Sequence, residues 1–188
     1  MAVRFDPGSG RVVASASADG QVFITTCYDE NLDKGHSATG PFASVDTDAD
    51  QLYKFSSNAW INTLSFSPSG EQLAFATHDC ELHFVRFTAE MVAAKEKPKP
   101  EKIIYRGNPI LNGLFLDENS YVGCGYDNVP LLFKRSAGGW AFSKSLDAGI
   151  NTKKPAKIGK DAFGVTSVFF DGQKLKEDVA IGAKETKH

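Results

Sequence analysis

The densest group of side chains that could do chemistry is the segment His78-Asp79-Cys80-Glu81-Leu82-His83. A zinc site needs three or four imidazole, thiolate or carboxylate ligands around one ion, at about 2.0–2.3 Å. The segment predicts a turn at 78–79 and then a strand, in which successive side chains point to opposite faces. Glu81 and His83 then share one face and Leu82 points away, so too few ligands converge. We therefore predict no metal site here, and the same spacing argues against a His-Asp hydrolase centre.

Other signatures of catalytic or cofactor sites are missing from the sequence. No G-x-S-x-G, P-loop or H-E-x-x-H motif occurs. The segment Gly8-Ser9-Gly10 lacks the lysine of a phosphate-binding loop and is typical of a β-turn. The cysteines are odd in number and widely spaced, which predicts free thiols buried in or beside strands: Cys27, Cys80 and Cys124. We predict no catalytic residue, no cofactor and no enzyme.

Composition excludes two classes of partner. The chain has 188 residues and a net charge of −2, so no general attraction to nucleic acid or to an anionic membrane is indicated. No apolar run approaches the roughly 18 residues of a membrane span, and no aromatic-basic nucleic-acid motif occurs. The charge is uneven, because residues 152–188 hold eight lysines and five acidic residues while the remainder is net negative. We therefore expect no nucleic acid and no membrane span, and a different kind of segment from about residue 152.

One pattern recurs three times, at residues 3–28, 62–87 and 112–135. Each copy has an alternating strand, a polar turn, a strand rich in small residues, a tight turn with an aspartate, and another alternating strand. The polar turns read DPGSG, SPSG and DEN, and the small-residue strands read VVASASA, LAFATH and YVGCGY. Proline, glycine and aspartate favour such turns through backbone geometry and local hydrogen bonds. The turn aspartates are predicted to hold the corner of each repeat: Asp19, Asp79 and Asp127.

This order of elements is typical of a blade of a WD-repeat β-propeller, so we predict an all-β fold with about three blades. The small-residue strand is expected to be the third of each blade, buried on both faces, and the strand after the aspartate turn the outer fourth. Residues 29–51 and 88–101 are expected to be solvent-exposed connectors, the second beginning as a short helix. Trp60 and Trp140 are expected to pack near blade edges, with a partner contact as the alternative for Trp140. The predicted organisation is three blades within 1–150, at about 2–28, 52–87 and 103–147, followed by a basic segment at 151–188.

Four stretches resemble one particular WD-repeat family. They read VVASASADGQVFITTCY, FSSNAWINTLSFSPSGEQLAFATHDCELHFV, YRGNPILNGLFLDENSYVGCGYDNVPLLFKR and GGWAFSKSLD. They are similar to subunit 1 of the actin-related protein 2/3 complex, over roughly residues 2–150. The resemblance implies the fourth to sixth blades of a seven-bladed propeller, with 151–188 as a basic insertion before a missing final blade. A propeller needs about 4–8 blades, so the chain is expected to be a segment of a longer protein.

The resemblance also implies a function. It suggests a non-catalytic scaffold subunit in the cytoplasm, at the actin cytoskeleton, that supports actin nucleation and branched filament assembly. The implied partners are the other subunits of the complex, the actin filament and nucleation-promoting factors. The family's insertion carries a protruding helix that contacts actin, and five apolar residues could form that contact here: Phe163, Val165, Val168, Phe169 and Phe170.

Alternatives remain open at this point. Residues 165–170 could instead be a strand packed against the blades, because so short a run has no decisive periodicity. The chain could be a WD-repeat adaptor of another multiprotein assembly. An enzyme built on a propeller would need titratable side chains that converge at the mouth of its channel.

Overall fold

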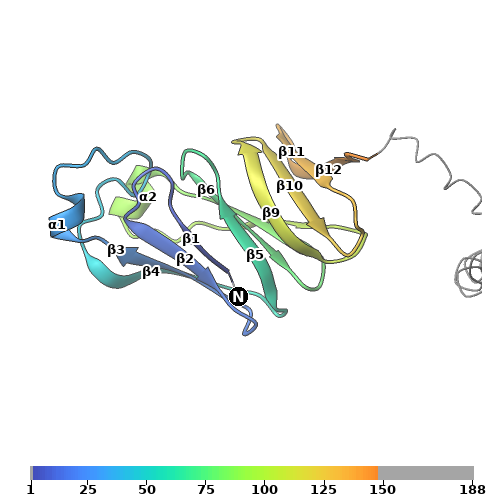
Figure 1. Cartoon of the computed structure of the whole chain (residues 1–188), viewed down its shortest axis with the longest axis horizontal. Helices are drawn as coiled ribbons and strands as arrows, with labels where there is room; N and C mark the ends of the chain where they lie inside the picture. Colours follow the sequence, from blue (N-terminus) through green and yellow to red (C-terminus); the bar gives the residue numbers. More distant parts are fainter. Residues whose placement is uncertain (1, 148–188) are drawn as a thin grey trace, which may run out of the picture. The chain divides into compact units, whose positions relative to one another are not determined.

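The computed structural model describes residues 2–147, which form three four-stranded antiparallel sheets (Figure 1). In each sheet the strands follow one another in chain order. The first sheet contains β1 (Ala2–Phe5), β2 (Val12–Ala16), β3 (Gln21–Cys27) and β4 (Asp48–Ser56). The second contains β5 (Ile61–Phe66), β6 (Gln72–Thr77), β7 (Glu81–Arg86) and β8 (Glu101–Ile104). The third contains β9 (Ile110–Asp117), β10 (Ser120–Gly125), β11 (Leu131–Ser136) and β12 (Gly139–Ser145).

Alternating side chains explain why these segments form strands. In β3 every second residue is buried, so Val22, Ile24 and Thr26 face the neighbouring sheet. The preceding turn closes through a hydrogen bond from the Gly20 amide to the Ser17 carbonyl, and Gly20 has φ +75°. Glycine tolerates this left-handed conformation without a steric penalty, which lets β2 and β3 pair directly. The predicted all-β fold, part of a WD-repeat β-propeller, is confirmed.

The order of strands within a blade differs from our expectation. The small-residue strands are second in each sheet (β2, β6 and β10), and the strands after the aspartate turns are third. In the first two sheets the outer fourth strand includes residues that the sequence pattern assigned elsewhere, whereas β12 lies within the predicted third blade. Residues 52–56 were assigned to the second blade, but Val22 pairs with Phe55 and Ile24 pairs with Tyr53. The reason is that the sequence repeat covers three consecutive strands, whereas a sheet also recruits the strand beyond the next long loop.

Two hydrophobic cores join the three sheets. One lies between the first and second sheets and the other between the second and third, and β6 contributes to both. Leu73 and Phe75 point into the first core, and Ala74 and Ala76 point into the second. Small side chains on one face let neighbouring sheets approach closely. The expectation of burial on both faces is therefore right for β6 but wrong for β2, because within residues 2–147 one face of the first sheet meets no other sheet.

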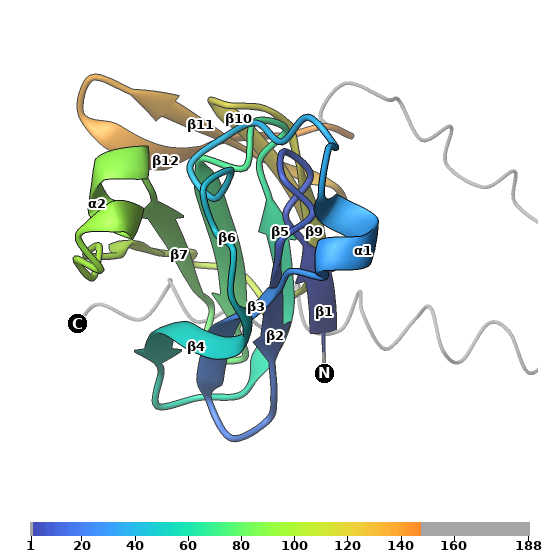
Figure 2. The ribbon, with the colours of Figure 1, turned by 90° about the vertical axis from the view of Figure 1, so that its left-hand side faces the viewer.

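The long connectors are only partly exposed, contrary to our expectation. They contain α1 (Glu30–Asp33) and α2 (Ala89–Ala93), and the second confirms the expected short helix (Figure 2). Phe42 is completely buried, with its ring centroid 5.1 Å from that of Phe87. Val92 on α2 is also buried in the first core. Buried apolar side chains therefore anchor both connectors, Phe42 and Val45 in the first and Val92 in the second, since burying one contributes roughly 1.5–3 kcal/mol.

Candidate functional site

The three turn aspartates lie at one end of the sheets. We call this the Asp-turn end, and it consists of loops 17–20, 57–60, 78–80, 105–109 and 126–130. Asp19 accepts a hydrogen bond from the Gln21 amide at 3.0 Å, and Asp79 accepts one from the Thr77 hydroxyl. Asp127 accepts bonds from the amide and the side chain of Asn108, the latter at 2.6 Å. Asp19 and Asp79 thus bond groups two residues away and help to order their own turns, whereas Asp127 bonds a more distant segment.

Asp127 has the most extensive bonding of the three. Desolvation acts to raise its pKa, but hydrogen bonds from Tyr105 and Asn108 outweigh it and lower the pKa below its ordinary value. The carboxylate is therefore ionised at neutral pH. It ties the linker before β9 to the turn between β10 and β11, because Asn108 lies in that linker.

The His78–His83 segment folds as the alternation predicts. Glu81 and His83 share one face of β7, with Glu81 Oε2 3.1 Å from His83 Nε2. Lys102 Nζ lies 2.8 Å from the other carboxylate oxygen. The His83 ring stacks on Phe75 at a centroid distance of 4.5 Å, and burial lowers its pKa despite the neighbouring Glu81. Within residues 2–147, no group of three or more metal-ligating side chains converges.

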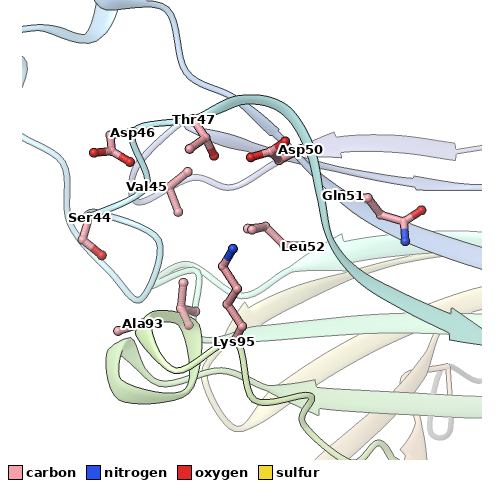
Figure 3. Close-up of a pocket in the computed structure, with 10 residues that line it drawn as sticks. Ser44, Val45, Asp46, Thr47, Asp50, Gln51, Leu52, Ala93 and Lys95 are labelled. Carbon is pink, nitrogen blue, oxygen red and sulfur yellow. The ribbon is translucent and has the colours of Figure 1, made fainter.

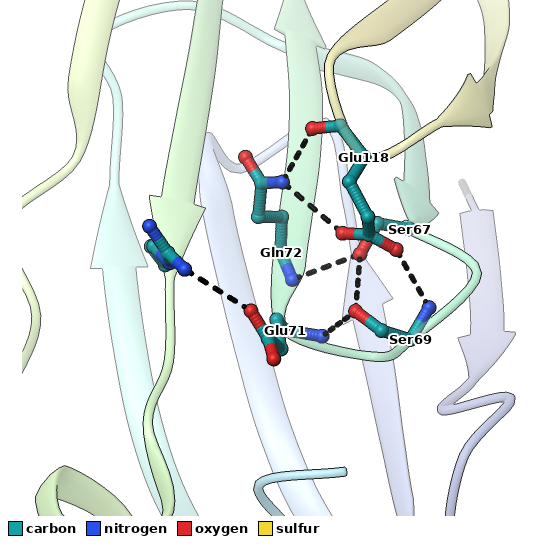
Figure 4. A network of polar contacts seen from close by, with 6 residues as sticks. Ser67, Ser69, Glu71, Gln72 and Glu118 are labelled. Atoms are coloured by element: carbon teal, nitrogen blue, oxygen red, sulfur yellow. Dashed lines mark hydrogen bonds and ion pairs between the residues drawn. The ribbon is translucent and has the colours of Figure 1, made fainter.

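A polar network missed by the sequence analysis joins the second and third sheets at the opposite end (Figure 4). Glu118, between β9 and β10, accepts a hydrogen bond from the Ser69 amide at 2.8 Å and one from Gln72 Nε2 at 3.2 Å. Gln72 Nε2 also donates to the Glu118 carbonyl at 2.7 Å. Burial alone would raise the pKa of Glu118, but these bonds outweigh it and lower the pKa. The network therefore locks two blades together through an ionised carboxylate.

Asp6 is a second functional group that the sequence analysis missed. It is 1% exposed, and its carboxylate accepts bonds from the Ser9 amide at 2.7 Å and the Ser9 hydroxyl at 2.6 Å. Gly70 of the neighbouring blade packs directly against Asp6 Oδ1. The signal was present in the sequence, because an aspartate that precedes Pro-Gly in a turn commonly bonds the backbone a few residues later.

A cavity with a volume of about 420 Å³ lies between residues 44–52 and the α2 region (Figure 3). Val45, Leu52 and Val92 form apolar walls. Asp46, Asp50 and Lys95 supply charge, and Figure 3 shows the Lys95 amine pointing into the space. Neither of its hydroxyls, Ser44 and Thr47, is hydrogen-bonded to a carboxylate or an amine among the described residues, so the cavity suits contact with another molecule better than a reaction.

The cysteines and tryptophans depart in part from expectation. Cys124 is exposed rather than buried, whereas Cys27 and Cys80 are partly buried. Burial, and then nearby aspartates, raises the pKa of both Cys27 and Cys80, which makes them weaker nucleophiles. Trp140 packs as expected, stacked on Phe84 at 4.1 Å, but Trp60 is 61% exposed. Trp60 lies on a linker between two sheets, where no core covers it.

The five residues expected to contact actin lie outside the described residues: Phe163, Val165, Val168, Phe169 and Phe170. No helix within residues 2–147 is long and apolar enough to cross a membrane.

The sequence of the chain is similar to subunits of one complex from several organisms. No family model matches the chain. Actin-related protein 2/3 complex subunit 1 of Schizosaccharomyces pombe is 28% identical over 160 residues, which cover 81% of this chain and 40% of the relative. Subunit 1B of Arabidopsis thaliana is 26% identical over 184 residues, covering 94% of this chain and 45% of the relative. Subunit 1 of Saccharomyces cerevisiae is 24% identical over 195 residues, covering 96% and 49%.

The chain is similar to actin-related protein 2/3 complex subunit 1. Similarity to this subunit from two yeasts and a plant agrees with the resemblance drawn from the residues. The chain spans less than half the length of these relatives of subunit 1.

Proposed function

We propose that the chain is part of the WD-repeat subunit of an actin-related protein 2/3 complex. It acts there as a non-catalytic scaffold that supports actin nucleation and branched filament assembly. The observation that carries this proposal is the similarity to subunit 1 from distant organisms across most of the chain. The three blades supply the framework that such a role needs.

The proposed position of these blades is the fourth to sixth of a seven-bladed propeller. The terminal sheets support this, because each exposes apolar residues on the face away from the second sheet. Val3 and Phe5 on β1 are 53% and 63% exposed, and Leu114 on β9 is 54% exposed. Neighbouring blades would bury such faces. Residues 151–188 are then the basic insertion before the final blade.

A scaffold must hold its blades in a constant arrangement, and the polar groups of this chain serve that purpose. The Glu118 network bridges the second and third sheets. Asn62 Nδ2 donates to the Ile110 carbonyl at 2.9 Å and bridges the same two sheets at the Asp-turn end. Two hydrophobic cores complete the connection. The proposed partners of this platform are the other subunits, the actin filament and nucleation-promoting factors, in the cytoplasm at the actin cytoskeleton.

Co-purification tests this function. The full chain, tagged and expressed in cells, should recover actin-related proteins 2 and 3 together with the smaller subunits. Recovery of a different, reproducible set of proteins would instead identify an adaptor of another assembly. Turnover of a substrate by the purified chain would contradict the non-catalytic role.

The proposed actin contact has a separate test. Replacing Phe169 and Phe170 with serine should reduce branch formation in a fluorescence microscopy assay of filament assembly, while the complex still assembles. Replacing Leu32, an exposed apolar residue of α1, with serine is the matched control and should leave branching unchanged. Failure of assembly in the double variant would place the two phenylalanines in the packed interior instead.

A further inference from the structure

An exposed row of aromatic rings crosses the Asp-turn end. Trp60 is 61% exposed and Tyr126 is 54% exposed, whereas Trp140 is 4% exposed. The Trp60 and His78 ring centroids are 5.7 Å apart, and those of His78 and Tyr126 are 6.2 Å apart. Large aromatic side chains grouped on a surface are typical of interaction sites. The packing of the sheets does not require these rings, because neither core includes them.

The row borders a groove that the fold holds in place. The groove has a volume of about 310 Å³ and is lined by Asn58, Ala59, Trp60, His78 and Asp79. We call it the Trp60 groove. The His78 amide donates a hydrogen bond to the Trp60 carbonyl at 2.8 Å, so the two loops that form the groove are joined directly. The groove is therefore largely formed before any partner arrives, which lowers the entropic cost of binding.

The charge around the Trp60 groove is negative. Asp79 lines the groove itself. The turn with Asp19 packs against it, since Gly20 lies in close contact with the Ser57 and Ala59 carbonyls. Asp127 is in the same loop as Tyr126 and is ionised. Within the five loops of the Asp-turn end, Arg106 is the one lysine or arginine. Carboxylates beside exposed aromatic faces form an environment that favours a cation.

We propose that the Trp60 groove binds an arginine side chain of a partner protein. The guanidinium would stack on the aromatic rings while its N–H groups donate to the Asp79 carboxylate. Arginine suits this site better than lysine, because its planar group can stack on a ring and donate in a fork at once. This inference goes beyond the proposed function and does not rest on it, since any basic partner segment of this chemistry would serve.

Titration of the full chain with short labelled peptides tests the proposal. The probes are a glycine-arginine peptide and matched peptides with lysine or glutamate in place of arginine, and the readout is fluorescence anisotropy. We expect binding in the order arginine, lysine, glutamate, with weaker arginine binding at high salt. Tryptophan fluorescence gives a second readout, because the chain has two tryptophans and Trp140 is buried. Equal binding of the arginine and glutamate peptides would overturn the proposal.

Variants locate the binding to the groove. Trp60→Ser and Asp79→Asn should each weaken arginine-peptide binding by about two- to fivefold, as expected for an exposed cation–π or charged contact. Asp79→Asn keeps an oxygen that can accept from Thr77, so the turn is retained. Leu32→Ser removes an apolar residue of similar exposure at the opposite end and should bind like the parent. The arginine-peptide affinity of Trp60→Phe should be intermediate, and this variant serves as the test if Trp60→Ser does not fold. Unchanged affinity in Asp79→Asn and the folded Trp60 variant would refute the assignment.

Discussion

Removing the Glu118 carboxylate should separate the contribution of one inter-blade network from that of the hydrophobic cores. The side chain accepts two charge-assisted hydrogen bonds, from the Ser69 amide at 2.8 Å and from Gln72 Nε2 at 3.2 Å. Such bonds each contribute about 1.5–3 kcal/mol when they are well shielded. Glu118 is only partly buried, so water can replace part of each bond. We expect Glu118→Ala to lower the free energy of unfolding by about 2 kcal/mol.

Thermal unfolding of the full chain, followed by circular dichroism, measures this effect. A loss of about 2 kcal/mol corresponds to a fall in Tm of about 4–8 °C for a domain of this size. Glu118→Gln should lose about half as much, because its one side-chain oxygen can still accept from Ser69.

The same residue makes a prediction about pH. The pKa of Glu118 is lowered from its ordinary value of 4.5, so its stabilising effect is present above that value. The effect should disappear as the pH falls through the lower pKa of the folded state. The difference in stability between the parent and Glu118→Gln should therefore shrink in acid.

Glu71 provides the matched control. It lies two residues after Ser69, whose amide donates to Glu118, and pairs with Arg86 at 3.2 Å, but both side chains are about half exposed. Exposed ion pairs contribute about 0–1 kcal/mol, so Glu71→Ala should change stability little. If Glu71→Ala and Glu118→Ala prove equally destabilising, the inter-blade network has no special role and the reasoning fails.

Three further changes test the packing. The lowered pKa of His83 means that the unfolded chain binds a proton at a higher pH than the folded chain does, so the free energy of unfolding should fall as pH drops below about 6.5. In urea unfolding, the free energy of unfolding of His83→Phe should fall less over the same pH range. Tyr121→Phe should raise Tm by a few degrees, because the Tyr121 hydroxyl is buried without a partner among the described residues, and a lowered Tm would contradict this. Gly70→Ala should lower the free energy of unfolding by more than about 1 kcal/mol, because Gly70 has φ +75° and lies against Asp6. Gly10 has φ +68° but open space around it, so Gly10→Ala should lower the free energy of unfolding by less in the same denaturation assay.

The sequence alone determined the local elements. Alternating apolar residues and turn residues predicted β2, β6 and β10 and the three aspartate turns, because these depend on neighbours only a few residues away. The face shared by Glu81 and His83 followed from the same alternation, and the structure brings their side chains to 3.1 Å. The fold class followed from three repeats of one pattern, and the family resemblance from longer stretches of sequence.

The tertiary structure decided which distant segments meet. β4 joins the first sheet across a loop of 20 residues, and Phe42 from that loop enters the first core. Glu118 bonds Ser69 and Gln72, which are more than 40 residues away. Trp60, His78 and Tyr126 come from three separate loops. Local patterns report only whether a residue suits a strand or a turn. Pairing between segments depends instead on how complete sheets pack, and that is why the inter-blade contacts and the Trp60 groove emerge only in three dimensions.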